Sequence, residues 1–263
     1  MSNSTETNTS LVEIISAAIK VPGVKVDREN FLLSIFKNET IEKRNEILEI
    51  GPVKAGCSKK ILRNIACRIV NERTIFSSTS SFLAGLPGGW VMAATIPADT
   101  LQFFGVALRA AQEISYLYGA KDLWNDGEVS TEEVQNQLIL YCGVMFGVSG
   151  ASSALRVVSS AMGKQLLKKL PQKALTKTFY YPIIKAICKI LGIKLTKDTF
   201  AKGVSKVVPI FGGIVSGAIT FFSMRPMGMR LVDSFEKVGF SYSKADFEAD
   251  WKDISEEFGI DKN

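Results

Sequence analysis

The sequence has no histidine among its 263 residues. That absence excludes the Ser-His-Asp and Cys-His catalytic arrangements, and it removes the imidazole ligands that are usual in zinc sites. The four cysteines form no CxxC pair, and Cys142 and Cys188 fall in apolar helical patterns, where a free thiol acts as a small hydrophobic group. This cysteine usage favours a reducing, cytoplasmic compartment.

Signals for secretion and for nucleotide binding are also missing. The first fifteen residues lack a basic region followed by a long apolar core, so we expect no secretory signal peptide. The glycines Gly85, Gly88 and Gly89 match neither the phosphate-loop pattern nor the dinucleotide-binding pattern, and no strand pattern precedes them. We therefore predict no cofactor.

The sequence is instead rich in apolar residues at helical spacing. Hydrophobic residues make up 46%, charged residues make up 22%, and the mean hydropathy is +0.15. These values lie at the apolar end of the globular range, which makes contact with a membrane worth testing. Glycines and prolines interrupt the apolar runs. The patterns predict an all-α fold, a multi-helix globular bundle with apolar helices broken by Gly or Pro.

The composition changes along the chain and suggests four regions. Residues 1–10 are polar and are expected to form a disordered tail. Residues 11–81 form an N-terminal helical region, with Asp27 as an N-cap, a helix over Thr40–Ile50 and another over 58–72. Residues 82–240 form the principal helical domain. The acidic tail at 241–263 is expected either to fold back on basic residues or to remain solvated.

The helix at 58–72 has one apolar and one basic side. Its predicted apolar side contains Ile61, Leu62, Ile65, Ile69 and Val70. Five basic residues share or flank the other side, namely Lys59, Lys60, Arg63, Arg68 and Arg73. Runs of charge usually face water, so we expect this basic side to be solvated.

The stretch 82–119 carries the main candidate polar site. Its apolar run ends at Asp99, where a new helix is expected to begin, and Arg109 and Glu113 then form a predicted i, i+4 ion pair. Segment 207–240 has a similar order of glycines, prolines and charges, which suggests a weak internal two-fold repeat. In that case Arg225 is the natural partner of Asp99. A hydrolase-like use of Asp99 is the catalytic alternative. The sequence alone ranks Asp99→Asn as more destabilising than Glu113→Gln.

Residues 122–133 imitate a calcium-binding loop. Asp122, Asp126, Glu128 and Glu133 fall at ligand positions of an EF-hand loop, but Trp124 occupies the third position and cannot bind the metal. The alternative is a capping box, in which Ser130 and Glu133 start the next helix. We favour the cap, so we predict no metal, with these four acidic residues as weak candidate ligands.

The helix that follows is wholly apolar from Leu138 to Leu155. Gly143 and Gly147 form a small-xxx-small step that allows the backbone of another element to approach closely. The run is 18 residues long, at the short end of the roughly 17 to 25 residues that cross a bilayer. Residues 82–98 and 207–224 are similar candidates. These runs suit either core helices or membrane spans.

Residues 156–206 carry twelve Lys or Arg and one acidic residue, for a net charge of +11. Hydrophobic residues alternate with the basic ones, as in an amphipathic helix on anionic lipid. The candidate lipid-binding residues are Lys164, Lys168, Lys169, Lys173, Lys177, Lys185 and Lys189. Nucleic acid is also attracted by such charge, but no nucleic-acid-binding motif is present, so we do not expect it as a partner.

Several segments resemble the EcsC family of bacterial proteins. They are LPGGWVMAATIPADTLQFFGVALRAAQEISYLYG, VMFGVSGA, TKTFYYPIIKAI and SKVVPIFGGIVSGAIT followed by MRPMGMRL, all within residues 82–240. The resemblance implies a helical fold and a link with membrane processes. The family has no established molecular activity, so the resemblance transfers no catalytic residue.

Two functional classes follow besides the enzyme that uses Asp99. The first is a membrane-associated helical protein at the cytoplasmic leaflet, peripheral or integral, which binds anionic lipid or a membrane protein complex such as a transporter. The second is a soluble all-α module that holds an apolar ligand or a partner helix between glycine-lined helix faces.

Overall fold

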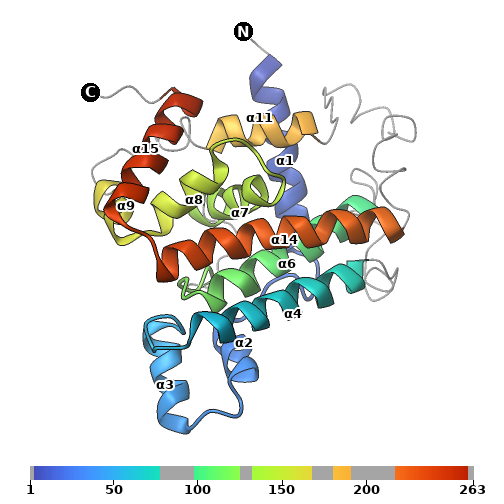
Figure 1. The fold of residues 1–263 in the computed structure, drawn as a ribbon. Helices are drawn as coiled ribbons and strands as arrows, with labels where there is room; N and C mark the ends of the chain where they lie inside the picture. The colour runs from blue at the N-terminus through green and yellow to red at the C-terminus, as the bar shows by residue number, and fades with distance from the viewer. Residues whose placement is uncertain (1–2, 78–97, 125–131, 168–179, 191–216, 260–263) are drawn as a thin grey trace.

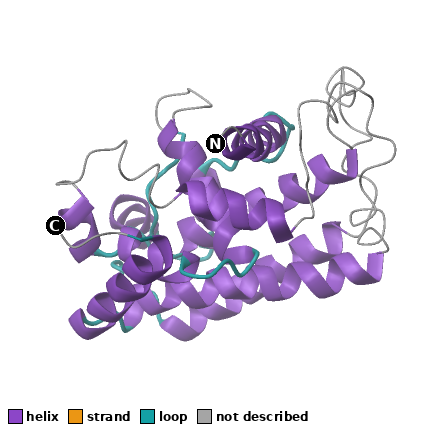
Figure 2. Ribbon diagram, turned by 90° about the horizontal axis from the view of Figure 1, so that it is seen from above, coloured by secondary structure: helices purple, strands orange, loops and turns teal. Residues whose placement is uncertain are grey.

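The computed structural model describes residues 3–77, 98–124, 132–167, 180–190 and 217–259. Every regular element in these ranges is a helix, which confirms the all-α prediction (Figures 1 and 2). The helices are α1 (Asn3–Ile19), α2 (Arg28–Ile35), α3 (Ile41–Ile50), α4 (Lys59–Ser77), α6 (Ala98–Leu117), α7 (Glu132–Met145), α8 (Ala151–Ser159), α9 (Ala161–Leu167), α11 (Tyr181–Ile190), α14 (Gly217–Phe240) and α15 (Lys244–Phe258).

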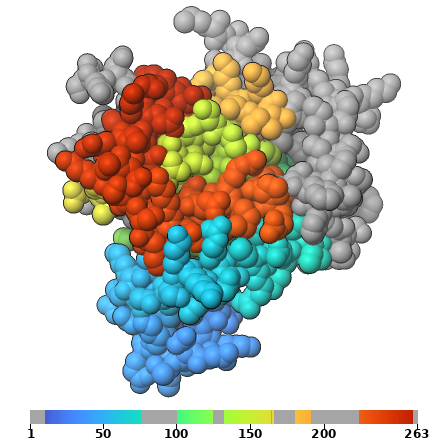
Figure 3. Space-filling view, viewed as in Figure 1, coloured from blue at the N-terminus to red at the C-terminus, as the bar shows by residue number. Residues whose placement is uncertain are grey.

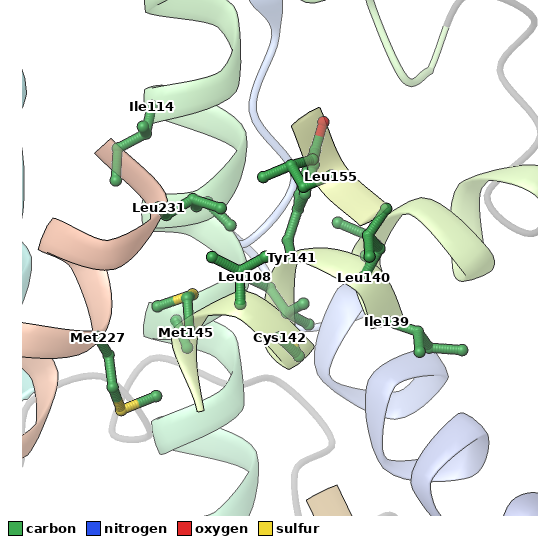
Figure 4. Close-up of a cluster of buried hydrophobic side chains, with 14 of the residues drawn as sticks. Leu108, Ile114, Ile139, Leu140, Tyr141, Cys142, Met145, Leu155, Met227 and Leu231 are labelled. Carbon is green, nitrogen blue, oxygen red and sulfur yellow. The ribbon is translucent and has the colours of Figure 1, made fainter. Parts of the chain in front are cut away.

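The helices pack around one hydrophobic core. Helix α14 lies against α4 and α6 and also contacts α7 and α8, while α11 packs on α1 and α7 (Figure 1). Helices α6, α7, α8 and α14 contribute the fully buried Leu108, Tyr141, Leu155 and Leu231 (Figure 4). Residues from both 11–81 and 82–240 belong to this core, so the predicted boundary near residue 81 does not separate two cores.

Local signals set several helix ends as the sequence predicts. Asp27 is the N-cap of α2, where its carboxylate accepts a 2.7 Å hydrogen bond from the Asn30 amide. Gly51 ends α3 with φ +84°, a conformation that favours glycine. A Cβ on Gly51 would lie 2.9 Å from the Cα of Gly119, so the ends of α3 and α6 meet backbone to backbone.

Both termini are more helical than the sequence predicts. Helix α1 begins at Asn3, within the region expected to be a disordered tail. Adding turns to a helix that is already formed costs much less than starting one, so the packed part of α1 supports its polar beginning. At the other end, α15 occupies most of the expected acidic tail. A capping box between Ser243 and Asp246 starts this helix, and Gly259 ends it.

The predicted apolar helix over 138–155 is two helices. Helix α7 ends at Met145 and α8 begins at Ala151, with Gly147 and Gly150 at φ +70° and +72° between them. The guanidinium of Arg230 stabilises this break, because its Nη1 donates a 2.7 Å hydrogen bond to the Met145 carbonyl. The expected single continuous helix is therefore wrong, and the buried residues of α7 and α8 belong to the protein core, one of the two alternatives for this run.

The sequence predicts apolar helices broken by Gly or Pro, but α14 runs through Pro226 without ending there. The proline is exposed, so its ring does not displace the neighbouring helices. In α4, Ile61 is 54% exposed rather than part of the apolar side. The first halves of the proposed repeat, 82–97 and 207–216, lie outside the described residues.

Candidate functional site

The predicted Arg109–Glu113 pair forms, and it is part of a larger buried cluster. Arg109 Nε lies 3.0 Å from Glu113 Oε1 on α6. Arg73 of α4 binds the same carboxylate through two contacts, Nε to Oε2 at 2.7 Å and Nη2 to Oε1 at 2.5 Å. Only 2% of the Glu113 side chain is exposed. We call Arg73, Arg109 and Glu113 the Glu113 clamp.

The Glu113 clamp is suited to structure rather than to proton transfer. Both carboxylate oxygens of Glu113 are held by charge-assisted hydrogen bonds from two helices. Arg109 also donates through Nη1 to the Gly23 carbonyl, which joins α6 to the turn after α1. A carboxylate engaged in this way ties three parts of the chain together and has little capacity left to act as a base.

Sequence reasoning missed Arg73 as a member of this cluster, and its expectation of a solvated basic side on α4 is wrong there. Residues 62, 66, 69 and 73 follow one another at spacings of four, three and four, which places Arg73 in line with the buried stripe of α4. This spacing is the signal in the sequence that places Arg73 beside the core. Arg63 keeps 39% of its side chain exposed, as expected, and it also binds α14, since its Nη1 lies 3.0 Å from Asp233 and 2.9 Å from Glu236.

Gln112, the neighbour of Glu113, is a second polar anchor on α6. It is fully buried, and its Oε1 accepts hydrogen bonds from the Val26 amide at 3.1 Å and from Trp124 Nε1 at 2.9 Å. Its Nε2 donates to the carbonyls of Val24 and Leu108. Every donor and acceptor of this amide is therefore used inside the protein, as a buried polar group requires.

Of the four candidate calcium ligands, the structure describes Asp122 and Glu133, while Asp126 and Glu128 lie outside the described residues. Asp122 Oδ1 accepts hydrogen bonds from the Tyr116 hydroxyl at 3.3 Å and the Trp124 amide at 3.0 Å. Burial raises the pKa of that hydroxyl, so it remains a donor. Among the described side chains, no group of three or more acidic or cysteine residues could hold a metal ion.

Asp99 and Arg225 are described only in part. Asp99 lies in the first turn of α6, but its side chain is outside the described set. Its role as a cap, a catalyst or an ion-pair partner therefore stays a prediction. Arg225 is exposed on α14, and its Nε donates to Asn71 Oδ1 of α4 at 3.3 Å.

A cluster of charged side chains also fixes α15 on α8, the helix in which the basic segment 156–206 begins. Arg156 binds Asp250 through Nε at 2.8 Å and Nη2 at 2.5 Å, and the Tyr242 hydroxyl donates to Asp250 Oδ2 at 2.8 Å. Burial opposes ionisation of Asp250, but these hydrogen bonds outweigh it, and the pKa of the carboxyl lies below its ordinary value. The acidic C-terminal segment therefore folds back on Arg156, one of the two predicted alternatives.

Helix α11 presents the basic surface for which the structure gives most detail. Its inner side is buried on α1 and α7 and consists of Ile183, Ile184, Ile187 and Cys188. Lys185 and Lys189 are exposed on the outer side, and Ile190 beside them is 49% exposed. We call these three residues the α11 outer face.

A glycine seats α11 on the core. A Cβ on Gly143 of α7 would lie 2.6 Å from Ile183 Cγ2 and 3.3 Å from the Cβ of Ala151. The close approach predicted at Gly143 is thus made by a helix of the same chain. Gly228 is covered similarly, because a Cβ there would lie 2.8 Å from Val70 Cγ2. Neither glycine is open to a foreign helix or ligand.

The remaining candidate lysines extend the basic segment beyond α11. Lys164 lies in α9 with its side chain outside the described set, and Lys168, Lys169, Lys173 and Lys177 lie outside the described residues. The charge of the segment is known from the sequence alone. It carries +11, whereas the rest of the chain has 20 basic and 25 acidic residues, a net of −5. Positive charge is therefore concentrated in one segment.

Within the described ranges, no helix combines the length and the apolar character needed to cross a bilayer. The candidate spans at 82–98 and 207–224 lie mostly outside these ranges. In comparisons with known proteins, the chain matches no family model, no curated protein and no solved structure. The resemblance of residues 82–240 to the EcsC family stays a prediction.

Proposed function

We propose that this protein binds the anionic headgroups of the cytoplasmic leaflet of the cell membrane through its basic segment, 156–206. The α11 outer face is the observation that carries the proposal, because it combines Lys185, Lys189 and an exposed Ile190 on a helix whose other side is packed in the core. Basic residues with an adjacent apolar side chain are the usual composition of such surfaces.

The rigid attachment of α11 supports this role. Its inner isoleucines are buried and Gly143 lets the helix approach α7 closely, so the two lysines are held on one surface. Each Lys close to an anionic surface contributes about 1 kcal/mol of attraction. Two lysines alone bind weakly, so the remaining basic residues of 156–206 are needed for stable association.

Binding to vesicles of phosphatidylcholine with an anionic lipid tests the proposal. We expect the double variant Lys185→Gln/Lys189→Gln to bind roughly 30-fold more weakly, because about 2 kcal/mol of attraction is lost. The matched control is Lys244→Gln/Lys252→Gln, which removes two exposed lysines from α15 at 83% and 74% exposure. Equal loss in both variants would mean that net charge, not the α11 outer face, determines binding.

Kinship with the EcsC family is part of this proposal. It is supported by the segments quoted above from residues 82–240, and its implied link with membrane processes agrees with the concentration of positive charge. A membrane protein partner in place of lipid is distinguished by the same assay, since a protein partner would leave vesicle binding absent.

A further inference from the structure

Helix α4 carries a largely exposed stripe, in which only Ile65 is packed against the core. Residues 61, 65, 68, 72 and 75 follow at spacings of four, three, four and three, which places them along one side of the helix. Ile61 and Ile75 are 54% and 58% exposed, and Ile65 between them is half-buried. Five large hydrophobic side chains are exposed in the described ranges, and two of them lie on this stripe.

The centre of the stripe carries one charge of each sign. Arg68 and Glu72 are 59% and 60% exposed, and their own i, i+4 pair is long at 3.9 Å. An exposed pair of this kind contributes little to the stability of the monomer, so its loss on rearrangement costs little. The opposite side of α4 is packed on α6 and α14. The spacing of the stripe is therefore that of a coiled-coil seam.

We propose that this stripe packs antiparallel against the same stripe of a second copy of the chain. A two-fold axis near residue 70 places Arg68 opposite Glu72 of the partner subunit, and Glu72 opposite Arg68 of the partner subunit. The same register places Ile65 opposite Ile75 of the partner subunit. Such self-complementarity is what an interface between identical chains requires. A two-fold axis at residue 68 would instead place Arg68 opposite Arg68 of the partner subunit. Repulsion between these two arginines disfavours that register, so the charges favour the axis near residue 70.

The dimer surface is separate from the α11 outer face, and the proposal does not rest on membrane binding. Figure 3 shows α4 at the surface just below α14, whereas α11 lies above α14 in the same view. The stripe is about 21 Å long at the rise of an α-helix. A strip of that length and about 10 Å wide, the diameter of a helix, covers on the order of 200 Å². This area is well below the roughly 800 Å² per partner of a standard interface, so we expect a reversible dimer that dissociates on dilution.

Sedimentation velocity over a range of protein concentrations tests the dimer. We expect Arg68→Glu and Glu72→Arg each to weaken the dimer at least about tenfold, because both symmetry-related pairs become repulsive. The double variant Arg68→Glu/Glu72→Arg restores opposite charges across the axis, so it should dimerise like the unmodified protein. Circular dichroism confirms that the exposed substitutions leave the fold intact.

The same experiment can overturn the proposal in three ways. A protein that remains monomeric at concentrations on the order of 100 μM has no such dimer. Dimerisation that persists in both single variants places the interface elsewhere. Failure of the double variant to recover would show that Arg68 and Glu72 do not face each other across a two-fold axis.

Discussion

The Glu113 clamp and the α11 outer face use positive charge in opposite ways. Arg73 and Arg109 both bind Glu113 and keep only 23% and 33% of their side chains exposed. Lys185 and Lys189 are exposed, and neither is joined to a carboxylate of the described residues. The guanidiniums of the clamp outnumber its one carboxylate, but they are engaged with Glu113 and mostly covered, so they stabilise the fold and are poorly accessible to a partner. The exposed lysines are therefore the better candidates for binding a partner.

The largest effect on stability is expected from Glu113→Gln. Removing the carboxylate leaves two neighbouring guanidiniums without their counter-charge, and loss of one member of a buried ion cluster costs about 3 to 4 kcal/mol. Urea unfolding measures the change in the free energy of unfolding. The matched control is Glu248→Gln, whose carboxylate is 65% exposed on α15 and should change stability by less than about 0.5 kcal/mol. Similar losses in both variants would show that the clamp is not structural.

A smaller effect, about 2 to 3 kcal/mol, is expected from Asp250→Asn. Asp250 is 6% exposed and has one guanidinium and one hydroxyl as partners, against two guanidiniums at Glu113. The loss of stability in Asp250→Asn should appear as detachment of α15 from α8. Faster proteolysis within residues 244–258 would report this change, with Glu256→Gln on the exposed side of α15 as control.

The contribution of the Asp250–Arg156 ion pair to the free energy of unfolding should fall as the solution becomes acidic. The folded-state pKa of Asp250 lies below the ordinary 3.8, so the ion pair stabilises the protein fully above that value and loses its effect as the pH falls through the lowered pKa. The stability difference between the unmodified protein and Asp250→Asn should thus be constant near neutrality and shrink in acid. A difference that grows as the pH falls would contradict the assigned ion pair.

The sequence predicts features that depend on neighbours along the chain. The cap at Asp27, the end of α3 at Gly51 and the Arg109–Glu113 pair all follow from spacings of a few residues, and all three are present. Close packing at Gly143 was also predictable, because only a small residue allows that approach.

Contacts between distant segments could not be predicted in the same way. Arg73 reaches Glu113 across 40 positions, and Asp250 reaches Arg156 across 94. These contacts depend on how α4 and α15 pack, which local spacing does not determine. The Arg73 contact raises the effect expected of Glu113→Gln above what the i, i+4 pair alone indicates. The ranking of Asp99→Asn above Glu113→Gln stays a prediction, because the side chain of Asp99 lies outside the described residues.

The most direct test of the account is co-sedimentation of the full chain with vesicles of defined charge. We expect binding to vesicles that contain anionic lipid, little binding to pure phosphatidylcholine, and release at about 1 M salt, where the screening length falls to about 3 Å. Equal binding to both kinds of vesicle, or no binding to either, would contradict the binding of anionic lipid by the basic segment.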